Sequence, residues 1–290
     1  MTPTTLTRSE TDSGLREGDA EVGDVVLHYV EAGDGPLVLL LHGFPEFWYG
    51  WREQMAPLVK AGYRVVAPDL RGYDLSSKPD GYTAYTADKL ASDIRGLIRV
   101  LGAESAMVVG HDWGGTVAWT LAMNHPEVVD RLVILNAAHP RKLNEGLRSP
   151  RQLLRSWYFF YFQLPKLPER RARRRNWRFL KRFLRDARPP YTADELDRYV
   201  EAWSQPGAAT AMIDYYRAAV RLGSKQEIRP VSAPTLVIWG QRDRYLGPRL
   251  AEPHHEDVPD LRVERLPDAS HWVHHDEAER VNELLVDFLA

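Results

Sequence analysis

The sequence predicts an α/β fold with a mostly parallel, eight-stranded sheet, helices on both faces of the sheet, and an inserted helical cap. Two observations lead to this class. Short apolar strands alternate with helical segments along most of the chain, a pattern typical of parallel sheets covered on both faces. The alternation stops after residue 138 and resumes near residue 226, and the segment between is helical, aromatic and arginine-rich. We expect that segment to lie over the ends of the strands.

The predicted strands are short apolar runs bounded by turn residues. Two of them flank the turn at Gly23 and Asp24 within residues 19–32, and the next, at 37–41, is apolar throughout, as in a strand covered on both faces. The other strands are expected at residues 63–68, 106–109, 132–135, 235–240 and 261–266. Apolar residues at helical spacing predict a helix at 86–101, ended by Gly102, and an amphipathic helix at 277–289.

Length and composition suit one large core with an insertion. The chain has 290 residues, of which 44% are hydrophobic and 27% charged. We expect a flexible tail over residues 1–15, a core built from residues 16–138 and 226–290, and a cap over residues 139–225.

Charge and cysteine content argue against several classes of function. The formal net charge of −2 gives no general attraction to nucleic acid or to an anionic membrane. The absence of cysteine removes disulfides and thiolate chemistry. The polar first residues lack a signal peptide, and no apolar run is long enough to cross a membrane, so we expect a cytoplasmic protein without nucleic-acid or membrane partners. The arginine run at residues 170–178 is expected to be a solvated helix face.

A strand–turn–helix motif is centred on Asp112. An apolar strand stops at Gly110, Asp112 follows, and Gly114 and Gly115 precede residues that form a helix. This is the context of a nucleophile elbow, in which a sharp turn lifts one reactive side chain above the sheet. The usual residue is serine, and here it is aspartate. Taken alone, the motif is also compatible with Asp112 as the N-cap of the helix that follows.

Other polar residues follow strands elsewhere in the predicted sheet. They lie at residues 42–46, at 241–243 and at 269–271. In an open α/β sheet, the carboxyl ends of the strands are where functional groups gather. The chain order of Asp112, Asp243 and His271 is nucleophile, acid, histidine, which is the order of the α/β-hydrolase triad.

The motifs together make the sequence similar to the α/β-hydrolase fold epoxide hydrolases. The similarity is carried by residues 42–46 (HGFPE), 110–115 (GHDWGG), 158–163 (YFFYFQ) and 215–218 (YYRA), with Asp243 and His271. The family pattern marks Tyr158 and Tyr216 as the two functional tyrosines. Tyr161 and Tyr215 are neighbours that an error of register would substitute for them.

The chemistry explains why an aspartate would replace serine. Attack by a carboxylate on a saturated carbon leaves an ester whose carbonyl belongs to the enzyme, so hydrolysis regenerates Asp112. In that second step His271 would take a proton from water while Asp243 orients its ring. The backbone N–H groups of Phe44 and Trp113 would stabilise the tetrahedral oxyanion.

An epoxide also needs a proton donor for the oxygen that leaves carbon. Phenols with a pKa near 10 stay protonated at neutral pH, and this is the role expected of Tyr158 and Tyr216. The resemblance further implies that Glu46 and His111 pair and hold the hydrolytic water, and that a cis peptide precedes Pro45 and aims the Phe44 N–H.

We expect neither a cofactor nor a metal. The run His274, His275 and Asp276 could suggest metal ligands, but it lies at the start of the closing helix, where surface positions are expected. The aromatic residues of the cap predict an apolar pocket, so the expected partners are a small apolar or aromatic epoxide and water. The aromatic residues concerned are Trp157, Phe159, Phe160, Phe162 and Trp203. The chain could act as a monomer or a homodimer.

Two alternatives remain at this stage. A haloacetate or haloalkane dehalogenase of the same fold would share the aspartate, histidine and acid. Haloacetate enzymes have arginine where Trp113 stands, and haloalkane enzymes usually have asparagine where Phe44 stands, so both positions favour the epoxide. A non-catalytic ligand-binding protein with this fold is the alternative of another class.

Overall fold

The protein, described here by a computed structural model over residues 6–10, 14–223 and 227–290, is built around one sheet. The strand order is β1-β2-β3-β5-β4-β6-β7-β8-β9. The pairs β1 with β2, β2 with β3 and β3 with β5 are antiparallel. Every other pair of neighbouring strands, from β5 across to β9, is parallel. The strands are β1 (Leu6–Glu10), β2 (Arg16–Val22), β3 (Val25–Ala32), β4 (Leu37–Leu41), β5 (Arg64–Pro68), β6 (Ala106–His111), β7 (Val129–Leu135), β8 (Thr235–Gly240) and β9 (Leu261–Leu266).

The eight strands expected from the sequence are confirmed as β2 to β9, and β1 adds a ninth at the edge. The expectation of a flexible tail over residues 1–15 is wrong for Leu6–Glu10, which pairs in antiparallel register with β2. The physical reason is that β2 would otherwise leave one row of backbone N–H and C=O groups unpaired, and a neighbouring segment of chain can satisfy them. Residues 1–5 and 11–13 of that tail, and the predicted cap boundary at residue 225, lie outside the described residues.

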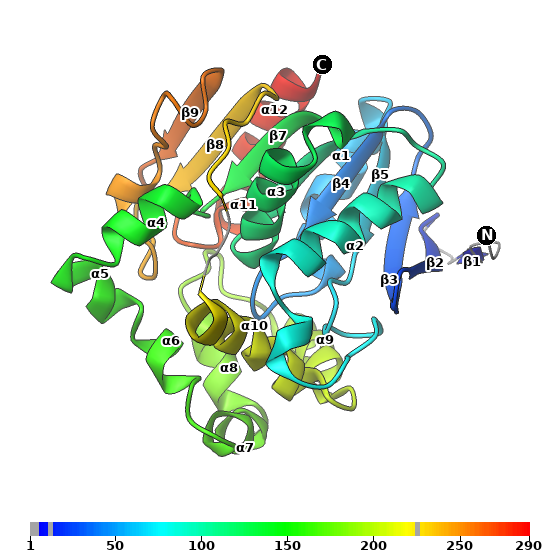
Figure 1. The fold of residues 1–290 in the computed structure, drawn as a ribbon. Coiled ribbons are helices and arrows are strands. Elements are labelled where there is room, and N and C mark those ends of the chain that lie inside the picture. Colours follow the sequence, from blue (N-terminus) through cyan, green and yellow to red (C-terminus); the bar gives the residue numbers. More distant parts are fainter. Residues whose placement is uncertain (1–5, 11–13, 224–226) are drawn as a thin grey trace.

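Helices of the core cover both faces of the sheet (Figure 1). Helices α2 (Ala87–Val100) and α3 (Trp113–Asn124) pack together on one face, and α1 (Arg52–Lys60) and α12 (Ala278–Leu289) pack on the other. Strand β4 shows why its sequence is apolar throughout: Leu39 and Leu41 enter the first core, and Val38 and Leu40 enter the second. The short helix α11 (Val273–Asp276) precedes α12.

Seven helices form the segment between β7 and β8. They are α4 (Pro140–Gly146), α5 (Pro150–Arg155), α6 (Trp157–Tyr161), α7 (Leu167–Arg173), α8 (Arg178–Leu184), α9 (Ala193–Ser204) and α10 (Ala208–Leu222). Two side chains tie this segment to loops that leave the carboxyl ends of β4 and β5: Trp203 Nε1 donates to Pro45 O at 2.6 Å, and Tyr215 OH donates to Arg71 O at 2.6 Å. The helices therefore lie over the carboxyl ends of the strands, at one end of the sheet in Figure 1.

Candidate active site

Asp112 lies in a sharp turn between β6 and α3. Its backbone has φ 50° and ψ −115°, a conformation rare for a residue with a side chain. A Cβ atom at Gly114 would lie 2.1 Å from Leu41 O, so the turn fits only a glycine there. The Asp112 carboxylate makes no capping bond to α3, and its Oδ1 instead accepts the N–H of Phe44 at 2.8 Å. Asp112 therefore occupies the N-cap position of α3 without capping the helix through its side chain, and the geometry is that of an elbow.

The structure brings together the three side chains of the predicted triad. His271 Nε2 lies 3.4 Å from Asp112 Oδ2, and His271 Nδ1 lies 2.7 Å from Asp243 Oδ2. Each residue follows a different strand of the sheet: β6 for Asp112, β8 for Asp243 and β9 for His271. The imidazole thus bridges two carboxylates at the carboxyl edge of the sheet.

Asn136, which sequence reasoning missed, holds the Asp243 carboxylate. Its Nδ2 donates to Asp243 Oδ2 at 2.7 Å, and its Oδ1 accepts the N–H of Gly240 at 2.8 Å. The N–H groups of Tyr245 and Leu246 donate to the other carboxylate oxygen at 2.6 and 2.9 Å. The available signal was the position of Asn136 directly after β7, at the same edge as the triad.

Electrostatics make Asp112 and His271 an ion pair at neutral pH. Burial works to lower the pKa of His271, but the carboxylates of Asp243 and Asp112 outweigh it and raise the pKa to about 10. Burial likewise works to raise the pKa of Asp112, but His271, His111 and the Phe44 N–H lower it below its usual value. The carboxylate of Asp112 is therefore ionised, as a nucleophile must be.

The residues expected to line an oxyanion site lie on both sides of Asp112. Phe44 follows β4 and precedes a cis peptide bond to Pro45, so the cis peptide expected from the sequence is confirmed. Its N–H already contacts Asp112 Oδ1. Trp113 is the first residue of α3, next to Asp112 in the chain.

Tyr158 and Tyr216 face Asp112 from the helical segment. They come from α6 and α10, their ring centroids are 5.6 Å apart, and both line a cavity of about 580 Å³ together with Asp112 and Trp113. Burial, reinforced by the Asp112 charge, holds the pKa of each phenol well above its usual value. Both phenols are therefore protonated at neutral pH and can donate hydrogen bonds.

The two neighbouring tyrosines are less suited as donors, although Tyr215 also lines the cavity. The Tyr215 hydroxyl donates to Arg71 O at 2.6 Å, so it is committed to the backbone of the core. Tyr161 does not line the cavity, and its buried hydroxyl has no hydrogen-bond partner among the described residues. The geometry thus favours Tyr158 and Tyr216 over these neighbours.

The cavity is lined mainly by apolar groups, but not by the aromatic residues named from the sequence. Among those five, Phe159 alone lines it. Phe162 and Trp203 are buried in packing contacts, whereas Trp157 is half exposed and Phe160 more than half exposed at the surface. The apolar wall comes instead from smaller side chains such as Leu143, Leu147 and Leu222.

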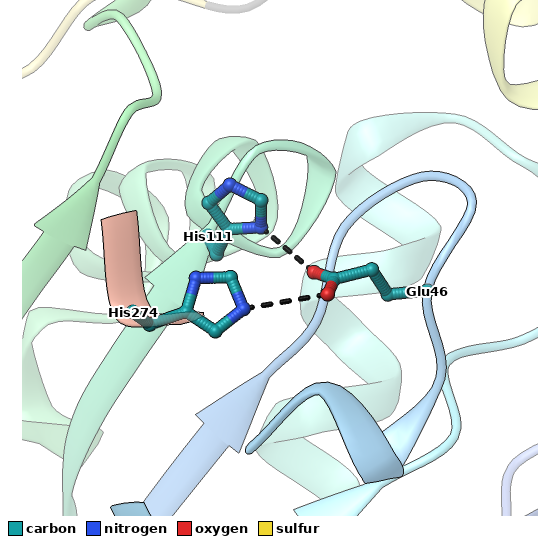
Figure 2. A group of neighbouring side chains, drawn as sticks. All are labelled: Glu46, His111 and His274. Carbon is teal, nitrogen blue, oxygen red and sulfur yellow. Dashed lines mark hydrogen bonds and ion pairs between the residues drawn. The ribbon is translucent and has the colours of Figure 1, made fainter. Parts of the chain in front are cut away.

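A buried cluster of Glu46, His111 and His274 lies beside the triad (Figure 2). The expected pairing of Glu46 with His111 is confirmed: Glu46 Oε2 lies 3.0 Å from His111 Nδ1. Glu46 Oε1 lies 3.3 Å from His274 Nε2 and also accepts the hydroxyl of Tyr199 at 3.3 Å. The expectation that His274 and His275 are surface residues is wrong, because α11 turns inward and buries both before α12 begins.

A hydrogen bond links the cluster to the backbone of His271. His111 Nε2 lies 2.9 Å from His271 O, and since a carbonyl can only accept, that nitrogen carries a proton. His274 and His111 hold the pKa of Glu46 well below its usual value despite its burial, so Glu46 is an anion here. One nitrogen or oxygen atom from each of the three side chains lies within 4.8 Å of the others, which is the spacing of a cation site. Hydrogen bonds between Glu46 and the two histidines already use these side chains.

Replacing Glu46 by alanine is expected to lower the free energy of unfolding by about 3–5 kcal/mol, because it leaves buried donors without an acceptor. Because the folded pKa of Glu46 is depressed, this contribution is present above about pH 4.5 and fades as the pH falls below that value. Urea unfolding of wild type and Glu46→Ala at several pH values measures the loss in free energy of unfolding and its pH dependence. Glu53→Ala, at an exposed carboxylate nearby, is the matched control. An equal effect of the two variants would contradict the prediction.

Comparisons with known proteins agree with this geometry. A family model described as the α/β hydrolase fold matches residues 36–278. AB hydrolase superfamily protein YfhM of Bacillus subtilis (strain 168) is 46% identical over 272 residues, covering 91% of this chain and 94% of the relative. Epoxide hydrolase 4 of Homo sapiens is 39% identical over 290 residues, covering 96% of this chain and 76% of the relative.

Solved structures of epoxide hydrolases also resemble this chain. An epoxide hydrolase from Bacillus megaterium in complex with an inhibitor is 34% identical, with a TM-score of 0.85 and coverage of 93% of this chain and 99% of that one. Epoxide Hydrolase A from Mycobacterium thermoresistibile is 31% identical, with a TM-score of 0.83 and 98% coverage of both chains. The chain therefore belongs to the α/β-hydrolase fold family, and within it to the epoxide hydrolases.

Proposed function

We propose that the protein hydrolyses an epoxide to a vicinal diol through a covalent ester on Asp112. One observation carries the proposal: an ionised carboxylate at the elbow, paired with His271, faces two protonated phenols across one cavity. A serine at this position would form an ether with an epoxide carbon, whereas the carboxylate forms an ester that water can cleave. The mostly apolar cavity favours a small apolar or aromatic epoxide as substrate.

In the first step, an oxygen of Asp112 attacks a ring carbon and the bond from that carbon to the epoxide oxygen breaks. The electron pair goes to the oxygen, which takes a proton from Tyr158 or Tyr216 while the other phenol donates a hydrogen bond. The raised pKa of both phenols ensures that the proton is present at neutral pH.

The second step depends on a change in charge that the first step causes. Once Asp112 is an ester, one of the two carboxylates that raise the pKa of His271 is neutral, so that pKa falls and the imidazole can act as a base. Its proton passes to the tyrosinate, and it then takes a proton from the attacking water. Asp243, held by Asn136 and two backbone N–H groups, orients the ring.

The tetrahedral intermediate places negative charge on the former carbonyl oxygen of Asp112. The Phe44 N–H, already 2.8 Å from Asp112 Oδ1, and the Trp113 N–H would stabilise that charge. Collapse of the intermediate breaks the bond to the substrate oxygen, which takes up the second proton of the attacking water and leaves as the diol. The carboxylate of Asp112 is restored beside the protonated His271. Glu46 and His111 would hold the hydrolytic water beside this centre, and residues 139–225 would form the cap that supplies the tyrosines.

Single turnover in ¹⁸O-labelled water tests the covalent route. Water attacks the ester carbonyl, so the label is expected in the Asp112 carboxylate and not in the first diol released. Mass spectrometry of the diol and of the peptide that contains Asp112 measures both. Label in the first diol would contradict the covalent mechanism. Offering haloacetate and haloalkanes beside epoxides, and scoring halide against diol, separates this function from dehalogenation.

Removing the phenolic hydroxyls is expected to slow ester formation. Each of Tyr158→Phe and Tyr216→Phe should lower the alkylation rate about 10- to 100-fold, and the double variant about 10³-fold or more, because a single remaining phenol can still donate. Stopped-flow quenching of tryptophan fluorescence follows that step, since Trp113 lies next to Asp112. Tyr161→Phe is the matched control and should leave the rate unchanged. A double variant as fast as either single variant would contradict a shared role.

A further inference from the structure

Exposed apolar side chains gather on one part of the protein. Of the nine large apolar side chains that are exposed among the described residues, six lie between residues 153 and 167. They are Leu153, Leu154, Trp157, Phe160, Leu164 and Leu167, which we call the cap apolar strip. Their spacing of mostly three or four residues runs along α5, α6 and the start of α7, at the outer edge of the helical segment in Figure 1. Leu154 is 77% exposed, so the part of the chain that the structure describes leaves it uncovered.

The same segment carries a strong positive charge. Residues 148–188 contain fourteen lysines and arginines against two acids, Glu169 and Asp186. Both acids are already paired, Glu169 with Arg217 at 2.7 Å and Asp186 with Arg244 at 3.0 Å. Within the part of the chain that the structure describes, no carboxylate lies at ion-pair distance from the exposed arginines of the run at 170–175. This charge is therefore available to a partner.

A groove joins the apolar strip to the arginines. Leu154 and Trp157 line it together with five arginines of the helical segment and two of the core. These are Arg151, Arg155, Arg171, Arg182, Arg185, Arg242 and Arg244, which we call the arginine groove. The groove has a volume of about 710 Å³ and opens on the surface. Asp186 and Asp243 also line the groove, and Arg244 and Arg242 are paired with Asp186 and Asp268. The seven arginines still outnumber the two acids, so apolar and mainly cationic groups share one face.

The chemistry of this face selects its partner. A second copy docked through the same face would bring the same positive charge and would be repelled. Nucleic acid would pair with the arginines but would leave four leucines without an apolar partner. An anionic bilayer satisfies both: its headgroups pair with arginine, and its acyl boundary takes the leucine, tryptophan and phenylalanine side chains. We propose that the cap apolar strip and the arginine groove dock the protein on an anionic phospholipid bilayer.

This docking is peripheral, without insertion of a spanning helix. No helix among the described residues is long and apolar enough to cross a membrane. The expectation of no membrane partner rested on the lack of a long apolar run and on the charge of the whole chain, −2. That net charge hides the positive segment because the remaining residues are acidic. A local surface, not the net charge, decides peripheral binding.

Co-sedimentation with vesicles tests the proposal. Phosphatidylcholine vesicles that contain about 30% phosphatidylglycerol should bind the protein at least about tenfold more tightly than phosphatidylcholine alone, and about 0.5 M NaCl should remove most of that difference. The double variants Leu154→Ser/Phe160→Ser and Arg151→Gln/Arg182→Gln should each weaken binding about tenfold or more. Their unfolding midpoints, measured in parallel, show that they remain folded.

Matched controls come from other exposed positions. Leu75→Ser removes an apolar side chain that is 55% exposed on the core, and Lys60→Gln/Arg249→Gln removes two exposed cations there. Both should bind anionic vesicles as the wild type does. Equal binding to both kinds of vesicle, or equal losses in the controls, would overturn the proposal. So would tight binding of a single-stranded oligonucleotide without vesicle binding, or a concentration-dependent dimer that Leu154→Ser/Phe160→Ser abolishes.

Discussion

Asp112→Asn is expected to lower turnover of any epoxide substrate by at least about 10⁴-fold, because an amide is a poor nucleophile at saturated carbon. The side chain keeps its size and can still accept the Phe44 N–H, so the elbow should keep its shape. Steady-state diol formation measures the loss. The intact mass of the variant, determined before and after the assay, excludes conversion of the amide back to the acid.

The pH dependence of stability gives Asp112→Asn a second readout. The folded pKa of His271 is raised to about 10, so its contribution to the free energy of unfolding is full below about pH 6.5 and is lost as the pH rises towards 10. Removing the Asp112 charge should shrink that loss. Asp257→Asn, at a buried carboxylate paired with Arg141, is the control and should keep both the activity and the pH profile. Retention of more than about a hundredth of the wild-type turnover by Asp112→Asn would contradict its role as nucleophile.

His271→Gln is expected to separate the two steps. Ester formation needs the ionised carboxylate and the phenols, whereas ester hydrolysis needs the imidazole as a base. The variant should therefore consume about one equivalent of epoxide and then stop, with steady-state turnover reduced at least about 10⁴-fold. Mass spectrometry should find the mass of the epoxide added to the peptide that contains Asp112.

His254→Gln is the matched control for His271→Gln. His254 is partly exposed, pairs with Glu145 at 2.9 Å and does not line the cavity of the triad. It should turn over at the wild-type rate without a trapped adduct. Sustained turnover by His271→Gln, or an adduct on a residue other than Asp112, would contradict the proposed hydrolysis step.

Much of the fold followed from local sequence patterns. The alternation of apolar strands and helical segments predicted eight of the nine strands, because a buried parallel strand needs an apolar run whatever lies beside it. The edge strand β1 was missed because Leu6–Glu10 is mostly polar, and its pairing with β2 depends on backbone groups that carry no side-chain signal.

The residues of the candidate site likewise fall into those that the sequence predicted and those that it missed. Asp112, Asp243 and His271 were found because each follows a strand, and the topology of a parallel sheet brings strand ends to one edge. His274 and Asn136 were missed because their roles depend on direction: a helix of four residues turns His274 inward to Glu46, and a loop aims Asn136 at Asp243. The choice of Tyr158 and Tyr216 rested on resemblance, and the contact of Tyr215 with Arg71 O supplied the physical reason for it.

The sequence by itself determined the residue types and their order along the chain, and with them the class of fold and the aspartate in the usual place of serine. The tertiary structure alone decided which titratable groups share a buried space, and therefore that His271 is a cation beside Asp112 and that Glu46 is an anion between two histidines. Charge states in a protein depend on burial and on neighbours within a few ångströms, which residues distant in the chain provide only once it has folded.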